Sequence, residues 1–175
     1  MTHAHASAAA LRARHRLGTL DPVYAAVLDS VDPGWSDSQA TRSRSADIRA
    51  LTVFIGRERH SDVPAAHVEA GRAVGAFAKR SRVAYAEGIL EPAAETALQK
   101  LAGWEWRAAD ARWYRALGHL RAWTRANPGA SLRAGVIHGD FPLGAWWSKT
   151  GAAILSGRLD PRRTREAAAA WAGDQ

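Results

Sequence analysis

The sequence predicts an all-α fold of tandem three-helix units, with two full units following an N-terminal partial unit. The phrase Gly-x-Leu-Asp/Glu-Pro begins at Gly18, Gly88 and Gly157, so the two intervals between its copies are equal to within one position. Apolar residues near each copy recur with the spacing of one buried helix face, and no segment alternates as a strand does. A fixed period of this kind indicates a repeat protein.

The N-terminal partial unit is expected over residues 1–35. Its sequence predicts helices over 8–16 and 22–31, the second starting at Pro22, where a first helical turn tolerates a missing N–H. This copy has no counterpart of the first helix found in the later units, so we expect it to cap the array. The polar, turn-forming residues 36–45 predict a linker.

The first full unit is expected over residues 45–106. Its first helix carries apolar side chains at i, i+3 and i+4 spacing, namely Ile48, Leu51, Phe54 and Ile55. A second helix has its buried stripe at Val74, Phe77, Ser81 and Tyr85. The third helix, over 92–101, is predicted to begin at Pro92 after a capping Glu91 and to end before Gly103.

The second full unit, expected over residues 107–175, repeats the text of the first. When Gly88 is aligned with Gly157, Leu51 corresponds to Leu120 and Phe54 corresponds to Trp123. The matched positions stay apolar, as a common packing scheme requires.

The order and spacing of these motifs resemble the helicase-associated domain of bacterial helicases, a three-helix module usually found in tandem. The matching segments of the first unit are Leu51-x-x-Phe54, His60-Ser-Asp-Val63-Pro64, Val74-Gly75-x-Phe77, Gly88-x-Leu90-x-Pro92 and Leu101-Ala-Gly103-Trp104-Glu-Trp106. The second unit repeats them with Trp113, Leu120, Trp123, Leu143-Gly144-x-Trp146, Gly157-x-Leu159 and Trp171. The resemblance extends from Leu17 to Trp171 and implies nucleic-acid binding.

The chain also departs from that family. Arg44 stands where the second unit has Trp113, and the basic run at 79–82 is reduced to a single Lys149 over 148–151. Residues 144–150 lack the two glycines of a phosphate-binding loop, so these 175 residues hold no helicase motor. We therefore expect the module to act alone or beside a separate helicase or regulatory protein.

The composition favours a polyanionic partner. The net charge is +7 and the sequence pI is near 10.7; three of the 24 basic residues are Lys, which leaves 21 Arg. Arg-rich, Lys-poor usage also follows from a GC-rich genome, so charge alone does not decide the partner. The absence of Cys excludes disulfides and thiolate metal sites, and no apolar run approaches the length of a membrane span. These features predict a cytoplasmic protein, associated with the nucleoid if it binds DNA.

Three basic groups are the candidate contacts to nucleic acid. The second-helix group is Arg72, Lys79, Arg80 and Arg82, extended in the second unit by Lys149. Arg158, Arg162 and Arg163 surround the start of the last helix, where a bound phosphate would reconcile cations with free N–H groups. Arg12, Arg14 and Arg16 form a candidate minor-groove arm. The alternatives are a solvated basic face, an unstructured C-terminus and an Arg-bearing helix edge without a partner.

The eight tryptophans recur at matched repeat positions, which predicts core packing in preference to stacking on single-stranded bases. Trp147 is the expected exception, because Trp146 takes the buried position beside it.

No metal, cofactor or enzymatic site is predicted. The loop residues His60, Asp62 and His67 fit no standard metal-ligand spacing. The tripeptide His138-Gly139-Asp140 is similar to the catalytic tripeptide of small-molecule phosphotransferases, but neither their nucleotide fold nor their downstream metal ligands are present. The prediction is therefore a non-enzymatic protein that binds duplex DNA in preference to single strands, as a small regulator or repressor. The alternative is a module that docks a helicase or another protein and has no DNA binding of its own.

Overall fold

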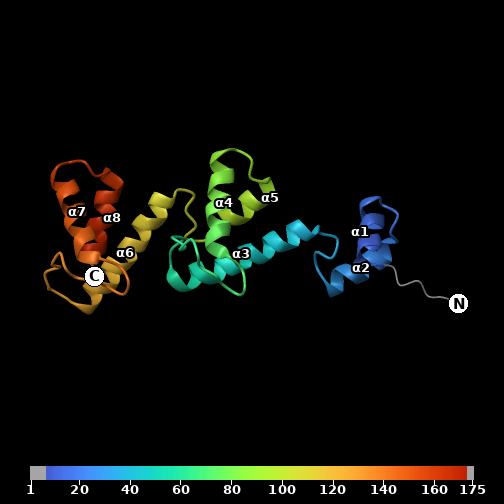
Figure 1. The fold of residues 1–175 in the computed structure, drawn as a ribbon, viewed down its shortest axis with the longest axis horizontal. Helices are drawn as coiled ribbons and strands as arrows, with labels where there is room; N and C mark the ends of the chain where they lie inside the picture. The colour runs from blue at the N-terminus through green and yellow to red at the C-terminus, as the bar shows by residue number, and fades with distance from the viewer. Residues whose placement is uncertain (1–6, 173–175) are drawn as a thin grey trace. The chain divides into compact units, whose positions relative to one another are not determined.

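The computed structural model describes residues 7–172, and this span folds into eight α-helices with no strand (Figure 1). The all-α prediction is thus confirmed. The chain divides into two compact units, Met1–Arg49 and Ala50–Gln175, and the division falls inside the third helix. No helix within the described span is long and apolar enough to cross a membrane.

The first unit contains α1 (Ala8–Arg16), α2 (Pro22–Val31) and the start of α3 (Gln39–Glu58). Helix α2 begins where Pro22 predicted it. The linker predicted over 36–45 is wrong, because α3 already starts at Gln39. Ser38 supplies the missed start signal, since its Oγ accepts the Thr41 N–H at 3.0 Å as an N-cap does.

The second unit opens with the remainder of α3, followed by α4 (Val74–Ala86) and α5 (Pro92–Gln99). The predicted stripes of α3 and α4 are buried at Leu51, Phe54, Val74, Phe77 and Ser81. Two details differ from prediction: the Glu91 side chain makes no cap hydrogen bond, and α5 ends at Gln99. Tyr85, the last residue of the α4 stripe, is 40% exposed and stacks on Trp106 with ring centroids 3.9 Å apart.

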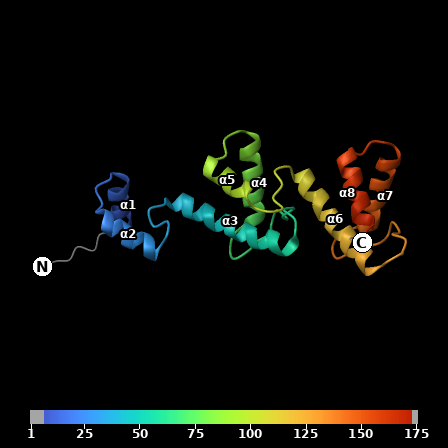
Figure 2. The ribbon, with the colours of Figure 1, turned by 180° about the vertical axis from the view of Figure 1, so that it is seen from behind.

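The same unit continues with α6 (Ala108–Ala126), α7 (Leu143–Leu155) and α8 (Pro161–Ala172). Helices α7 and α8 run beside each other and are joined by a short turn, and α6 contacts both (Figures 1 and 2). Their common core contains Trp113, Leu117, Leu120, Trp123, Leu143, Ala167 and Ala170.

The loops before α4 and α7 have the same local geometry at positions that the sequence repeat matches. Gly75 N–H donates to the His67 carbonyl at 3.2 Å, and Gly144 N–H donates to the Val136 carbonyl at 2.9 Å. Each loop closes with an antiparallel bridge between a single pair of residues, at 69 and 72 and again at 138 and 141. The sequence repeat is therefore matched by a repeat of backbone hydrogen bonding.

The tryptophans are largely in contact with the core. Four of them are at least nine-tenths buried: Trp35, Trp104, Trp113 and Trp123. The expectation that Trp147 points away is wrong, because Trp147 is half-buried against the α6–α8 core and stacks on Trp171 at 5.0 Å. Trp171, at the end of α8, is itself 39% exposed and covers that ring.

Candidate nucleic-acid interface

Two neighbouring cations on α4 are exposed to solvent. Lys79 and Arg80 form no hydrogen bond or ion pair with any residue in the span 7–172. In the sequence repeat, Arg80 corresponds to Lys149 on α7, which is likewise exposed and without such a partner among the described residues. These three side chains keep their full donor capacity for an external anion.

Arg82, two residues further along α4, is used differently. Its Nε donates to the Glu105 carbonyl at 2.9 Å, and its Nη2 donates to the Ser61 carbonyl at 2.9 Å. The guanidinium also lies over the Trp104 ring, 4.4 Å from the centroid. Burial lowers the pKa of Arg82 because it penalises the charged form. Arg82 thus ties α4 to two other segments, and its donors are taken up inside the protein.

Ser61 is the partner that sequence reasoning missed. It is fully buried, and its Oγ accepts the Glu105 N–H at 3.0 Å and a second bond from Arg82 at 3.3 Å. A lone Ser between two polar loop residues gives no sequence signal for this position. Its role depends on contacts with residues that are distant along the chain.

Two of the three arginines of the predicted N-terminal arm donate hydrogen bonds to backbone carbonyls within the protein, as Arg82 does. Arg12 Nε donates to the Trp35 carbonyl at 2.6 Å, and an Arg14 Nη2 donates to the Thr19 carbonyl at 3.2 Å. When Gly18 is aligned with Gly88, Arg12 corresponds to Arg82, so both units use an Arg at this position to hold the chain near a buried Trp. Arg16 is exposed, with no hydrogen bond or ion pair to another described residue. Arg72, which was predicted to lie on the second helix, lies instead in the loop before α4; it is half-buried and interacts with other residues of the chain.

The start of α8 is not an open anion site. Asp160 caps the helix, because its Oδ1 accepts the N–H groups of Arg162 and Arg163 at 2.8 and 3.2 Å. The phosphate expected to satisfy these N–H groups is therefore replaced by a carboxylate from the chain itself. Asp21 caps α2 in the same manner through Val23 and Tyr24.

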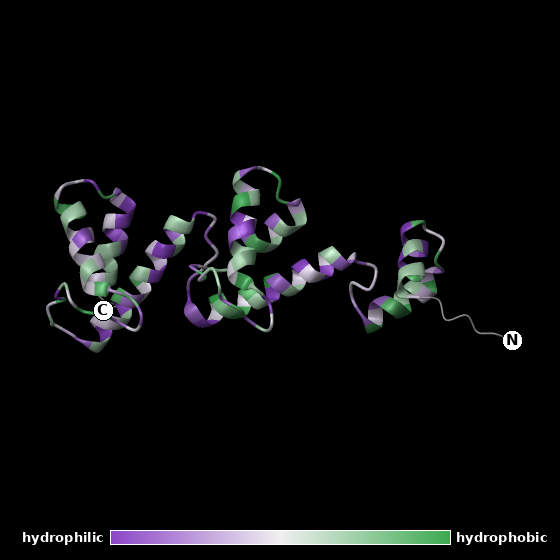
Figure 3. Cartoon of the chain, viewed as in Figure 1, coloured by the Kyte–Doolittle hydropathy of each residue, from purple (hydrophilic) through white to green (hydrophobic). Residues whose placement is uncertain are grey.

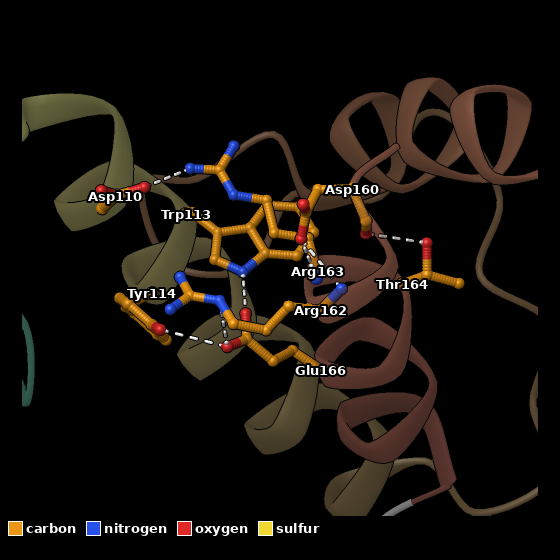
Figure 4. Close-up of polar contacts among 8 residues, drawn as sticks. All are labelled: Asp110, Trp113, Tyr114, Asp160, Arg162, Arg163, Thr164 and Glu166. Atoms are coloured by element: carbon orange, nitrogen blue, oxygen red, sulfur yellow. Dashed lines mark hydrogen bonds and ion pairs between the residues drawn. The ribbon is translucent and has the colours of Figure 1, made fainter. Parts of the chain in front are cut away.

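Two side chains of the first turns of α8, Arg163 and Glu166, face α6 (Figure 4). Arg163 forms an ion pair with Asp110 and lies over the Trp113 ring, 5.2 Å from its centroid. Glu166 accepts the Trp113 Nε1–H at 2.7 Å and the Tyr114 hydroxyl at 3.1 Å. These contacts join α8 to α6. Arg162 and Arg158 remain exposed to solvent. Arg162 Nε lies 3.4 Å from Glu166 Oε1, and Arg158 Nε donates to Ser156 Oγ at 2.8 Å.

A second cluster that sequence reasoning missed surrounds Arg115 on α6. Its two Nη atoms reach the carboxylates of Asp62 and Asp140 at 3.3 and 2.7 Å, so it links the loop before α4 to the loop before α7. Beside it, the Nδ1 atoms of His119 and His138 lie 2.9 Å apart, a hydrogen bond that requires one ring to be the acceptor. Asp140 of the phosphotransferase-like tripeptide is therefore engaged in an ion pair.

The predicted contact residues fall into two groups, according to whether their side-chain N–H groups are used inside the protein or face solvent. Arg12, Arg82 and Arg163 are committed to structural contacts, whereas Lys79, Arg80, Lys149 and Arg16 present their charges to solvent. Comparison with protein-family models, curated proteins and solved structures gives no match to this chain.

Proposed function

We propose that this protein binds duplex DNA through the exposed cations of α4 and α7, with phosphate contacts dominating the affinity. The observation that carries the proposal is the recurrence of a solvent-facing cation, Arg80 and Lys149, at equivalent positions of two helices. Such an arrangement suits binding to a polyanion, which offers phosphates at regularly spaced points. The net charge of +7 supports the same class of partner.

We further propose that the helices are organised as two helicase-associated-like units, α3–α5 and α6–α8, after a partial unit of α1 and α2. The matched loop hydrogen bonds before α4 and α7 support this organisation. In this arrangement the second helix of each unit offers the principal phosphate contact. A single chain then contacts DNA at more than one point without dimerising.

The test is fluorescence anisotropy of a labelled duplex and of its separated strand, titrated with the full chain at several NaCl concentrations. Duplex affinity is expected to exceed single-strand affinity and to fall steeply with salt. Replacing Lys79→Ala with Arg80→Ala removes two phosphate contacts and should reduce the slope of log K against log salt by about 2. Lys149→Ala should reduce it by about 1.

A matched control removes the same charge elsewhere. Lys100 and Arg107 are exposed, and Lys100→Ala with Arg107→Ala lowers the net charge as much as the α4 double variant does. This control should leave the salt slope nearly unchanged. Absence of binding to either DNA form at low salt, or an equal loss of slope in the control, would refute the proposal.

A further inference from the structure

Helix α2 carries a stripe of large apolar side chains exposed to solvent. The exposed fractions are 74% for Val23, 48% for Tyr24, 54% for Val27 and 79% for Val31. Val23, Val27 and Val31 follow one another at i+4 spacing, so they lie along one side of the helix. Most of α2 is apolar (Figure 3). Asp29 is its one charged residue.

The α2 stripe can be aligned with α8, because the two helices begin in the same way. Gly18 and Gly157 have φ of 67° and 65°, and Asp21 and Asp160 cap the first turn through the same pair of backbone N–H groups. Placing Asp21 on Asp160 fixes the register of the two helices. Positions 24, 27 and 31 of α2 then correspond to 163, 166 and 170 of α8.

In α8 these three positions contact a first helix, α6, whereas Arg162, the counterpart of Val23, is 60% exposed. Arg163 pairs with Asp110 of α6, and Glu166 accepts bonds from two aromatic side chains of the same helix. The Ala170 carbonyl accepts a bond from Thr124, also on α6, at 3.3 Å. The repeat thus identifies what covers this face elsewhere in the chain, namely an amphipathic helix with an aromatic and Leu stripe.

The α2 face is more apolar than the corresponding face of α8, and this difference indicates which kind of helix can bind to it. Tyr24 and Val27 replace a charged Arg and Glu, so a helix seated here must present apolar side chains at those points. An open hollow of about 490 Å³ lies beside them, lined in part by Leu11, Leu20 and Arg14. Arg14 and Arg16 are exposed along the neighbouring helix, so carboxylates flanking the apolar stripe would complement their charge.

We propose that the α2 face is a docking site for an amphipathic helix of a partner protein, with a Leu and aromatic stripe flanked by acidic residues. This helix would take the place that α6 takes against α8. The proposal concerns a different surface from the cations of α4 and α7 and stands independently of DNA binding.

The test uses a fluorescent peptide with the α6 sequence, in which Arg112→Glu, Arg121→Glu and Arg125→Glu make the solvent side acidic. The stripe Trp113, Leu117, Leu120 and Trp123 is kept. Anisotropy with the full chain should show saturable binding. Val27→Asp with Val31→Asp places unpaired carboxylates in the contact and should weaken binding at least about tenfold.

Three controls keep the result specific. Leu155 is 90% exposed on α7, so Leu155→Asp adds a charge to another apolar surface and should leave peptide affinity unchanged. A peptide that also carries Leu117→Asp and Leu120→Asp should not bind. Because positions 27 and 31 are exposed, their variants should keep the helical circular dichroism and the duplex affinity of the wild type.

Absence of peptide binding, or an equal loss with Leu155→Asp, would overturn the proposal. If the peptide does not bind and light scattering instead shows a dimer that Val27→Asp dissociates, a second copy covers the face and the proposed partner is wrong.

Discussion

Arg80 and Arg82 lie two residues apart on α4, yet Arg80 faces solvent while Arg82 donates to the carbonyls of Ser61 and Glu105. Arg82→Ala leaves these acceptors unpaired and removes the cation from Trp104. We expect it to lower the free energy of unfolding by about 2–3 kcal/mol, measured by urea denaturation. Arg80→Ala should change that free energy by no more than about 0.5 kcal/mol.

The pair of variants also separates stability from binding. Arg80→Ala should weaken duplex binding at constant stability, whereas Arg82→Ala should leave the affinity of the folded fraction nearly unchanged. Equal stabilities for the two variants would contradict the internal role of Arg82. The sequence could not make this distinction, because both residues lie within one basic run and the partners of Arg82 are distant along the chain.

His119 predicts a pH dependence of stability. Burial, followed by the charges of His138 and Arg115, lowers its pKa below the ordinary value of 6.5. The unfolded chain therefore binds this proton more readily, so the free energy of unfolding rises with pH between the lowered pKa and about 6.5. The stability that depends on a neutral His119 is therefore fully present above that interval, and it is lost as the pH falls through the interval.

His119→Gln should reduce the difference between the urea midpoints measured at neutral and mildly acidic pH, because Gln retains a hydrogen-bonding group but does not titrate. The His119 Nδ1 can act as the acceptor in its bond to His138 only while the His119 ring is neutral. The same midpoint difference in wild type and variant would show that this pair does not govern the pH response.

At the scale of elements, the loops before α4 and α7 depend on two glycines. A Cβ on Gly75 would lie 2.0 Å from the Pro64 carbonyl oxygen, and a Cβ on Gly144 would lie 2.0 Å from that of Arg133. Backbone atoms cannot move aside as side chains do. Gly75→Ala and Gly144→Ala should each destabilise the protein by about 3 kcal/mol or more.

Gly118 provides the control, because it lies inside α6 and a Cβ there meets no atom within 4 Å. Gly118→Ala should stabilise the protein by roughly 0.5–1 kcal/mol, the usual gain from removing a helix-interior glycine. Thermal unfolding followed by circular dichroism compares the three variants. Destabilisation by Gly118→Ala, or tolerance of Ala at Gly75, would contradict the packing described here.

The elements themselves were largely predictable from sequence. Pro22 and Pro92 mark helix starts because a first turn does not need their missing N–H, and the apolar spacing of α3 and α4 identifies their buried faces. The early start of α3 was missed because Ser38 lies in a polar stretch that composition alone assigns to a turn. Trp147 was misplaced because its cover, Trp171, comes from another helix.

At the scale of the whole chain, the two compact units differ in the size of their cores. In the first unit, the buried hydrophobic residues among those described are Leu20 and Trp35, and α1 and α2 contain none. The second unit buries its helices against one another, with fully buried leucines at positions 51, 98, 117, 120 and 143. Burial is the main stabilising term, so local stability should follow this division.

Amide hydrogen exchange followed by mass spectrometry tests this difference. Amides of α1 and α2 should exchange much faster than those of α6, since opening the first unit exposes little apolar surface. Leu120→Ala should lower the protection of α6–α8, because it opens a cavity costing about 2–5 kcal/mol, and should leave exchange in α1 and α2 unchanged. Equal protection throughout, or a change in α2 on Leu120→Ala, would show instead that the units unfold as one. Binding of the α6-derived peptide should slow exchange in α2, because covering the stripe from Val23 to Val31 stabilises only the folded form of that helix.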